Sequence, residues 1–436
     1  MGFPRDRVKF NVGGKIFETK ATTLAVAGKN SFFRAMFDEN WNLQSDAAIT
    51  EHFIDRNPDY FGVLLDLLRT GELYIPPKID KKFLYREAEY YGILDHVRSA
   101  ECDTFDGNRL RLAKSITGLS AGDGKFTPAI RADPNGWCCV SQGNVVHVYN
   151  WMLEEHPTIN LDYRKVNDVC WVDSENIVVS SDEKIANGGM GLFRASTGEL
   201  RYKFQATDEM NDYTTGILSC SSDYKLFSSC KSTSNGHEIG GWDQVTGKQI
   251  DFLPYYTYGN ASRLQGTNCL MAISFHPRDG NCCISLLDFR KNTMVMSWSD
   301  VRDRVNKLCI TDQTEFRDVI AIEESYSICV VDKNERSTTD ASVEWKETTR
   351  DNTNSSFFGG NNNCYPKLAF HEGQLFSSMK DRISVYCGSD WVLTSEVRQS
   401  HGGWICDFSI GGDRLFALHG DEDIFDVWET PCPPIK

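Results

Sequence analysis

Residues 8–24 read VKFNVGGKIFETKATTL, and this stretch decides how the N-terminal part of the chain folds. Apolar and polar residues alternate from Val8 to Val12, as they do in a strand with one buried face. Gly13 and Gly14 follow, a pair typical of a tight hairpin turn, and residues 15–19 supply a returning strand. We therefore expect an antiparallel hairpin at this position.

Helical patterns follow the hairpin. Ser31 is placed to cap a short apolar helix. Asn57 and Pro58 favour the start of another helix. The asparagine side chain can cap it, and the N–H that proline lacks would have no partner in the first turn. Gly71 predicts the end of that helix. Residues 80–97 predict one last helix, because apolar residues recur there at helical spacing: Leu84, Ala88, Tyr91 and Leu94.

Three segments at matching spacing carry a resemblance to a known family. Residues 8–24, residues 53–73 (FIDRNPDYFGVLLDLLRTGEL) and residues 83–94 (FLYREAEYYGIL) resemble the BTB/POZ fold of the potassium-channel tetramerisation type, also called T1 or KCTD-like. The resemblance implies an α/β assembly domain at residues 6–100. Zinc-binding members place His and Cys around the RTG segment, and this chain has none there. We therefore expect no metal and assembly through protein contacts alone.

Residues 105–436 consist of short apolar runs separated by Gly, Asn, Asp and Ser. Seven of these runs contain an anchor residue, and the anchors are 44, 49, 46, 43, 55 and 42 residues apart: Tyr149, Phe193, Trp242, Asp288, Val331, Tyr386 and Trp428. Such a period is typical of a four-stranded propeller blade, with each anchor in the third strand. We expect an all-β, seven-bladed β-propeller that resembles the WD40 and YVTN types. An array of β-sandwiches is the alternative.

The last repeat ends just after its third strand, because Pro431, Pro433 and Pro434 cannot continue a strand. The missing fourth strand is therefore expected from residues 109–116, which would close the ring between its two ends and remove open edges. No buried Asp/His/Ser network is evident from the sequence.

The longest spacing marks an insertion rich in Asn, Ser and Thr, residues 334–363. Phe357 and Phe358 lie inside this polar tract and make it a candidate target-binding loop. A merely flexible loop is the alternative.

The net charge of −15 lies entirely outside residues 1–100, which hold 14 basic and 14 acidic residues. An acidic body repels phosphate groups, so neither nucleic acid nor membrane is an expected partner, and a basic protein target fits better. No secretory start or spanning segment is evident, which favours the cytoplasm or nucleus. In a reducing compartment most of the 15 cysteines are small buried hydrophobes. Neighbours in the pair Cys138–Cys139 should point to opposite faces of one strand, so that one thiol faces inward and the other outward.

We found no complete catalytic or nucleotide-binding motif, and we expect neither an enzyme nor a cofactor. Residues 118–125 end in Gly-Asp-Gly-Lys, but Phe126 stands where a phosphate loop needs Ser or Thr. A propeller enzyme or lectin remains an alternative.

The BTB/POZ resemblance implies the function. Many such domains self-associate and bind cullin-3, so the chain is expected to be a substrate adaptor of a cullin-3-type ubiquitin ligase. The alternative is an oligomeric scaffold, or a partner of channels or signalling proteins, without cullin binding. Asp55 and Arg56 are candidates for self-association or internal pairing. The candidate cullin-binding residues follow the first short helix and include one tyrosine of the last helix, with Tyr90 as its alternative: Phe37, Asp38, Asn40, Trp41 and Tyr91. Phe37 and Tyr91 are equally well interpreted as core residues.

Overall fold

The computed structural model divides the chain into two compact units, with the boundary between Thr104 and Phe105. We call residues 1–104 the N-terminal unit and residues 105–431 the C-terminal unit. Each unit has buried apolar clusters of its own. The structure describes the following residues: 7–28, 31–36, 51–101, 105–119, 129–207, 212–220, 224–232, 237–253, 261–263, 269–275, 282–288, 293–301, 307–310, 318–322, 328–332, 346–349, 367–379, 381–388, 392–398, 404–420 and 423–431.

The N-terminal unit begins with the predicted hairpin. Strands β1 (Arg7–Val12) and β2 (Lys15–Lys20) pair antiparallel along their whole length, and β3 (His52–Ile54) pairs parallel to β1 on its other edge. Gly13 and Gly14 make the turn with φ of 55° and 89°, a left-handed conformation that glycine adopts readily. A Cβ on Gly13 would also lie 2.5 Å from the carbonyl oxygen of Arg56, so the turn has no room for a side chain.

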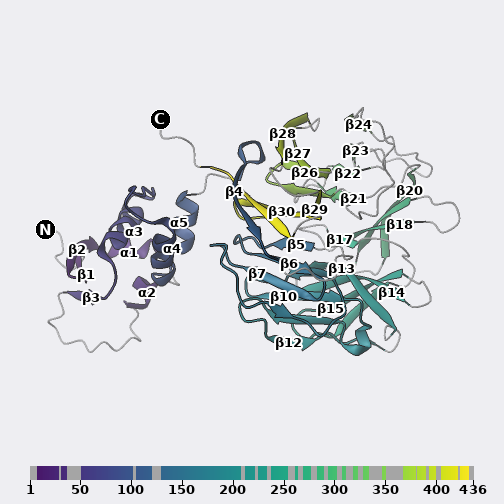
Figure 1. Ribbon diagram of the computed structural model, residues 1–436, viewed down its shortest axis with the longest axis horizontal. Helices are drawn as coiled ribbons and strands as arrows, with labels where there is room; N and C mark the ends of the chain where they lie inside the picture. Colours follow the sequence, from purple (N-terminus) through teal and green to yellow (C-terminus); the bar gives the residue numbers. More distant parts are fainter. Residues whose placement is uncertain are drawn as a thin grey trace. The chain divides into compact units, whose positions relative to one another are not determined.

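The described residues of this unit also form five helices, whose buried residues share one core with the strands (Figure 1): α1 (Ala21–Ala25), α2 (Phe32–Met36), α3 (Pro58–Thr70), α4 (Lys81–Tyr90) and α5 (Leu94–Glu101). The predicted helix ends are confirmed. Ser31 Oγ accepts a hydrogen bond from the Arg34 amide at 3.2 Å, and Asn57 Oδ1 accepts one from the Asp59 amide at 3.0 Å. Helix α3 ends at Gly71, whose φ is 77°.

The prediction of a single helix over residues 80–97 is wrong. Helix α4 stops at Tyr90 and α5 starts at Leu94, because Gly92 takes a left-handed φ of 64°. The Gly92 amide donates to the Glu89 carbonyl and the Ile93 amide donates to the Ala88 carbonyl, which closes the end of α4 with a glycine cap. The apolar spacing resembled one helix because both helices bury their apolar faces in the same core.

The C-terminal unit contains, in its described residues, seven four-stranded antiparallel sheets, which we call blades 1 to 7. Each anchor run of the sequence forms the third strand of a blade, as predicted. Blade 1 consists of β5 (Ala129–Ala132), β6 (Cys138–Gln142), β7 (Val145–Tyr149) and β8 (Ile159–Asn160), and blade 2 of β9 (Val166–Trp171), β10 (Asn176–Ser181), β11 (Met190–Arg194) and β12 (Leu200–Lys203). Blade 3 consists of β13 (Tyr213–Cys220), β14 (Lys225–Ser232), β15 (His237–Asp243) and β16 (Gln249–Leu253), and blade 4 of β17 (Ala261–Arg263), β18 (Cys269–Phe275), β19 (Cys282–Asp288) and β20 (Thr293–Val301). Blade 5 consists of β21 (Lys307–Ile310), β22 (Asp318–Ile322), β23 (Ile328–Asp332) and β24 (Lys346–Thr349), and blade 6 of β25 (Leu368–His371), β26 (Gln374–Met379), β27 (Arg382–Cys387) and β28 (Val392–Arg398). Blade 7 consists of β29 (Ile405–Gly411), β30 (Arg414–His419), β31 (Ile424–Glu429) and β4 (Arg111–Thr117).

The blades form a ring, which makes this unit a β-propeller. First strands of successive blades contact one another, including β5 with β9, β9 with β13, and β29 with β5 across the closure. Figure 1 shows the first strands toward the centre of the ring and fourth strands such as β12 and β28 at its rim. Blades 1, 2 and 7 each share an apolar cluster with the blade on either side, so both of their faces are covered. Cys138 and Cys139 point to opposite faces of β6, as predicted, but the expectation that one of the two thiols faces outward is wrong. Both are fully buried, in two different apolar clusters, because neighbouring blades cover both faces of the sheet.

Blade 7 draws its strands from the two ends of the unit, because β4 pairs antiparallel with β31. A hydrogen-bond network joins them. Ser115 Oγ on β4 donates to Asp426 Oδ1 at 2.5 Å, and His419 Nε2 lies 3.2 Å from Asp426 Oδ2. This Asp–His–Ser network was not evident from the sequence, because Ser115 and Asp426 lie 311 residues apart.

We predict that Asp426→Ala lowers the free energy of unfolding of the propeller by about 2–4 kcal/mol, because it leaves buried His419 without its carboxylate partner. Tryptophan fluorescence during urea unfolding reports this change, since nine of the ten tryptophans lie in residues 105–431. Asp413→Ala, at a half-buried residue in the turn between β29 and β30, is the control and should change stability by less than about 0.5 kcal/mol. Equal effects of the two variants would contradict the prediction.

Candidate functional site

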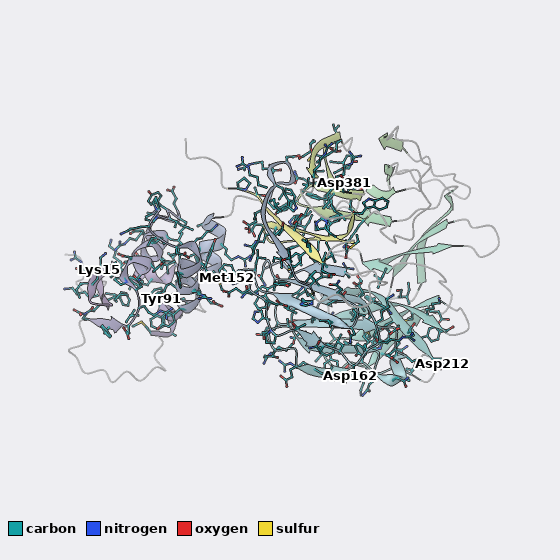
Figure 2. The ribbon with its side chains drawn as sticks, viewed as in Figure 1. Lys15, Tyr91, Met152, Asp162, Asp212 and Asp381 are labelled. Atoms are coloured by element: carbon teal, nitrogen blue, oxygen red, sulfur yellow. The ribbon has the colours of Figure 1, made fainter. Side chains whose placement is uncertain are left out.

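Tyr91 lies in the core of the N-terminal unit, where Figure 2 labels it. Its side chain is 0% exposed, and its ring stacks on Phe33 with the centroids 5.4 Å apart and also packs against Phe61. Burial raises the pKa of the phenol well above its ordinary value, and the nearby Glu87 carboxylate adds to this shift. A partner protein therefore cannot touch Tyr91 without rearranging the core, which matches the core interpretation of this residue.

Tyr90, the neighbouring residue, is 44% exposed and forms part of a surface that we call the α2/α4 patch. The patch comprises Phe32, Arg56, Glu87 and Tyr90. The Arg56 guanidinium lies 4.1 Å from the centroid of the Tyr90 ring, and Arg56 Nε donates a hydrogen bond to Glu87 Oε2 at 3.0 Å. The Phe32 ring packs against the Tyr90 ring with their centroids 5.5 Å apart. Arg56 is thus paired internally, one of the two roles that its sequence position allowed.

The α2/α4 patch adjoins the candidate cullin-binding residues in the sequence, since helix α2 ends at Met36. Those residues, Phe37, Asp38, Asn40 and Trp41, lie outside the described residues, as do Phe357 and Phe358 of the candidate target-binding loop. Asp55 is described and exposed.

Ionic contacts join the first strands of several blades, and we call these contacts the axial network. Its members are Arg131, Asp168, Lys367 and Asp407. Arg131, on β5 of blade 1, lies between two carboxylates. Arg131 Nη2 donates to Asp168 Oδ1 of blade 2 at 2.7 Å, and Arg131 Nη1 donates to Asp407 Oδ2 of blade 7 at 2.5 Å. Lys367, just before β25 of blade 6, donates to Asp407 Oδ1 at 2.5 Å. Three blade boundaries are therefore joined by charge pairs.

The same carboxylates also bind backbone amides of the following blade. Asp407 Oδ2 accepts from the Ile130 amide of blade 1 at 3.0 Å, and Asp168 Oδ2 accepts from the Leu218 amide of blade 3 at 3.0 Å. First strands present one edge without a ladder partner, so their amides need acceptors from elsewhere. The two aspartates supply these acceptors and set the register between neighbouring blades.

The pKa values in the axial network follow from this arrangement. Burial by itself raises the pKa of Asp407, but Lys367 and Arg131 outweigh burial and lower it to about 2. Burial and the charge of Arg131 lower the pKa of Lys367 to about 8, against the pull of Asp407. Burial lowers the pKa of Arg131, yet Asp168 and Asp407 raise it above its ordinary value. The Asp407 carboxylate therefore stays ionised at neutral pH.

The axial network is a framework rather than a reaction centre. Its two positive and two negative charges neutralise one another, and each polar group is used in a bond between blades. Across the described ranges, no group of three His, Cys, Asp or Glu side chains is arranged to hold a metal ion. Within those ranges, none of the helices has the length and apolar character that crossing a bilayer requires.

Comparison with known proteins gives two family matches and full-length relatives. Residues 8–102 match the family model of the BTB/POZ domain, and residues 118–430 match the model described as "At2g24240-like, C-terminal beta propeller". Two Arabidopsis thaliana proteins, BTB/POZ domain-containing proteins At4g30940 and At2g24240, are 56% and 55% identical over the full length of both chains. Human BTB/POZ domain-containing protein KCTD17 is 39% identical over 34% of this chain and 48% of its own length.

A solved structure supports the fold of the C-terminal unit. A chain in the crystal structure of the mitotic checkpoint complex matches with a TM-score of 0.53 at 12% identity, over 76% of this chain and 94% of that chain. A likeness at this identity is evidence for the fold alone.

We predict that Asp407 contributes about 2 kcal/mol of stability that depends on pH. Because its pKa is lower in the folded chain, this contribution is complete above about pH 4 and is lost as the pH falls toward 2. Urea unfolding of wild type and Asp407→Asn at several pH values measures it. The two curves should differ most near pH 6 and converge in acid. Asp381→Asn, at an exposed position in blade 6, is the control. A difference that stays constant with pH would refute the assignment.

Proposed function

Since the chain belongs to the BTB/POZ proteins with an At2g24240-like C-terminal β-propeller, we propose that it is a substrate-specific adaptor of a cullin-3-type ubiquitin ligase. The N-terminal unit self-associates and binds cullin-3, and the propeller captures the protein to be ubiquitinated. The adaptor acts by proximity in the cytoplasm or nucleus and has no catalytic residue of its own. The observation that carries this proposal is the joining of an assembly fold to a separately cored propeller in one chain.

The α2/α4 patch supports a cullin-binding face in the N-terminal unit. Its Tyr90 ring is exposed and is held in place by Arg56 and Phe32, so an aromatic surface is ready before any partner arrives. Exposed aromatic and arginine side chains are the residues most often found as interface hot spots. Trp41, five residues beyond the end of α2 in the sequence, is the proposed anchor of the cullin contact.

Charge supports a basic target for the propeller. Residues 101–436 carry the whole net charge of −15. Acidic side chains stand exposed on several blades, including Asp162, Asp212 and Asp381, which Figure 2 labels. An acidic ring attracts basic segments and speeds their association. We propose that Phe357 and Phe358 add apolar contacts to this capture.

We predict that the full chain forms a complex with the N-terminal region of cullin-3 that elutes as one peak in size-exclusion chromatography. Trp41→Ala should weaken this complex by roughly tenfold or more, as loss of an interface anchor does. Trp404→Ala, at a partly exposed tryptophan of the propeller, is the control and should leave binding unchanged. No complex at tens of micromolar would overturn the cullin proposal and favour an oligomeric scaffold without cullin binding.

We also predict that Asp55 lies at a contact between copies of the chain. Because Asp55 is exposed, Asp55→Arg should leave the fold intact while it lowers the self-association constant by roughly tenfold through repulsion at the contact. Light scattering coupled to chromatography measures the molar mass over a concentration series. Asp381→Arg makes the same charge change on the propeller and should have no effect. An unchanged molar mass for Asp55→Arg would exclude this residue from the contact.

A further inference from the structure

Two cysteines of neighbouring blades lie side by side in the propeller. Cys170 on β9 of blade 2 and Cys220 at the end of β13 of blade 3 have their sulfur atoms 3.1 Å apart. Both side chains are partly exposed, so small reagents reach them.

The axial network explains why these two thiols meet. Asp168 of β9 binds the Leu218 amide of β13, which fixes the register between the two first strands. Two residues further along each strand, side chains point the same way again, because strand side chains alternate with a period of two. Cys170 and Cys220 are those two residues. Their approach is therefore set by a buried hydrogen bond and not by chance rotation of exposed side chains.

Cys138, Cys139, Cys230 and Cys387 lack this combination of proximity and access. Cys138 and Cys139 are fully buried, and burial raises the pKa of both thiols well above the ordinary value. Burial likewise raises the pKa of Cys230 to about 12. Such thiols stay protonated and unreactive near neutral pH. Cys387 is partly exposed, but its sulfur accepts hydrogen bonds from the side-chain amides of Asn108 and Gln374 and from the hydroxyl group of Thr394.

We propose that Cys170 and Cys220 form a redox modification site, at which a peroxide converts the two thiols into a disulfide that joins blades 2 and 3. The sulfur atoms must approach from 3.1 Å to about 2 Å for the bond to form. This site is independent of cullin binding.

The chemistry balances with hydrogen peroxide as the oxidant. One thiolate attacks a peroxide oxygen, the O–O bond breaks, and a sulfenic acid forms while the departing hydroxide takes a proton and leaves as water. The second sulfur then attacks the sulfenic sulfur, the S–O bond breaks, and a second water leaves as the S–S bond forms. Peroxide gains two electrons, and each cysteine sulfur loses one. A dithiol reductant reverses the modification.

The disulfide would close a loop of about 50 residues that contains the rest of blade 2. Closing a loop of this length restricts the unfolded chain, so oxidation stabilises the propeller. It also prevents blades 2 and 3 from separating at their inner strands. Oxidation would therefore change the rigidity of one sector of the ring without blocking an existing bond of the axial network.

The test is oxidation of the purified full chain with a small excess of hydrogen peroxide, followed by digestion without reductant and mass spectrometry. We expect a linked peptide pair containing Cys170 and Cys220, lighter by two hydrogen atoms than the free peptides, which dithiothreitol separates. The melting temperature of the oxidised chain should rise by several degrees.

Cys170→Ser and Cys220→Ser should each abolish both the linked pair and the rise in melting temperature, whereas Cys387→Ser should keep both. The linked pair is measured in wild type, so the test does not depend on the folding of any variant. Cys170 linked to a different cysteine would overturn the proposal, and so would oxidation of both thiols to sulfinic acids without linkage.

Discussion

The position of Arg131 between Asp168 and Asp407 is the interaction on which the propeller depends most. A blade is a sheet with two apolar faces, and it becomes stable only when neighbouring blades cover both. At the centre of the ring, however, first strands bring unpaired amides and charged side chains together. Arg131 and the two aspartates satisfy these groups across blades 7, 1, 2 and 3, and Lys367 extends the bonds to blade 6. The apolar faces supply most of the stability, and the axial network fixes how the blades are aligned.

Ring closure uses the same principle at the rim. Strand β4 comes from the start of the C-terminal unit and completes a blade made by its end. Ser115 bonds to Asp426, which also pairs with buried His419, so the two ends of the unit share one polar network. Cys170 and Cys220 depend on the alignment that Asp168 sets between blades 2 and 3. The axial network thus acts between blades, whereas the network of Ser115, Asp426 and His419 acts within blade 7.

The N-terminal unit is organised differently. Its core is aromatic, with Tyr91 stacked on Phe33 and packed against Phe61. The charged pair Arg56–Glu87 covers this core on one side and holds Tyr90 at the surface. A rigid core beneath an exposed aromatic surface suits assembly, because little side-chain freedom is lost when a partner binds. The neutral charge of this unit likewise suits contact between identical copies, since it avoids long-range repulsion.

The sequence by itself determined the features that rest on local interactions. It predicted the β1–β2 hairpin from two glycines, the ends of α3 from Asn57 and Gly71, and the third strands of all seven blades from their period. Each of these depends on residues close together in the chain. Even so, the local signal was insufficient at Gly92, where two helices with a common apolar face resembled one.

Only the tertiary structure decided the features that join distant residues. The contact between Arg131 and Asp407 spans 276 residues, and that between Ser115 and Asp426 spans 311. It also decided that Tyr91 is buried while Tyr90 is exposed, and that Cys170 and Cys220 meet. No local pattern encodes such pairs, because their partners are set by the closing of the ring and by the packing of helices against one another.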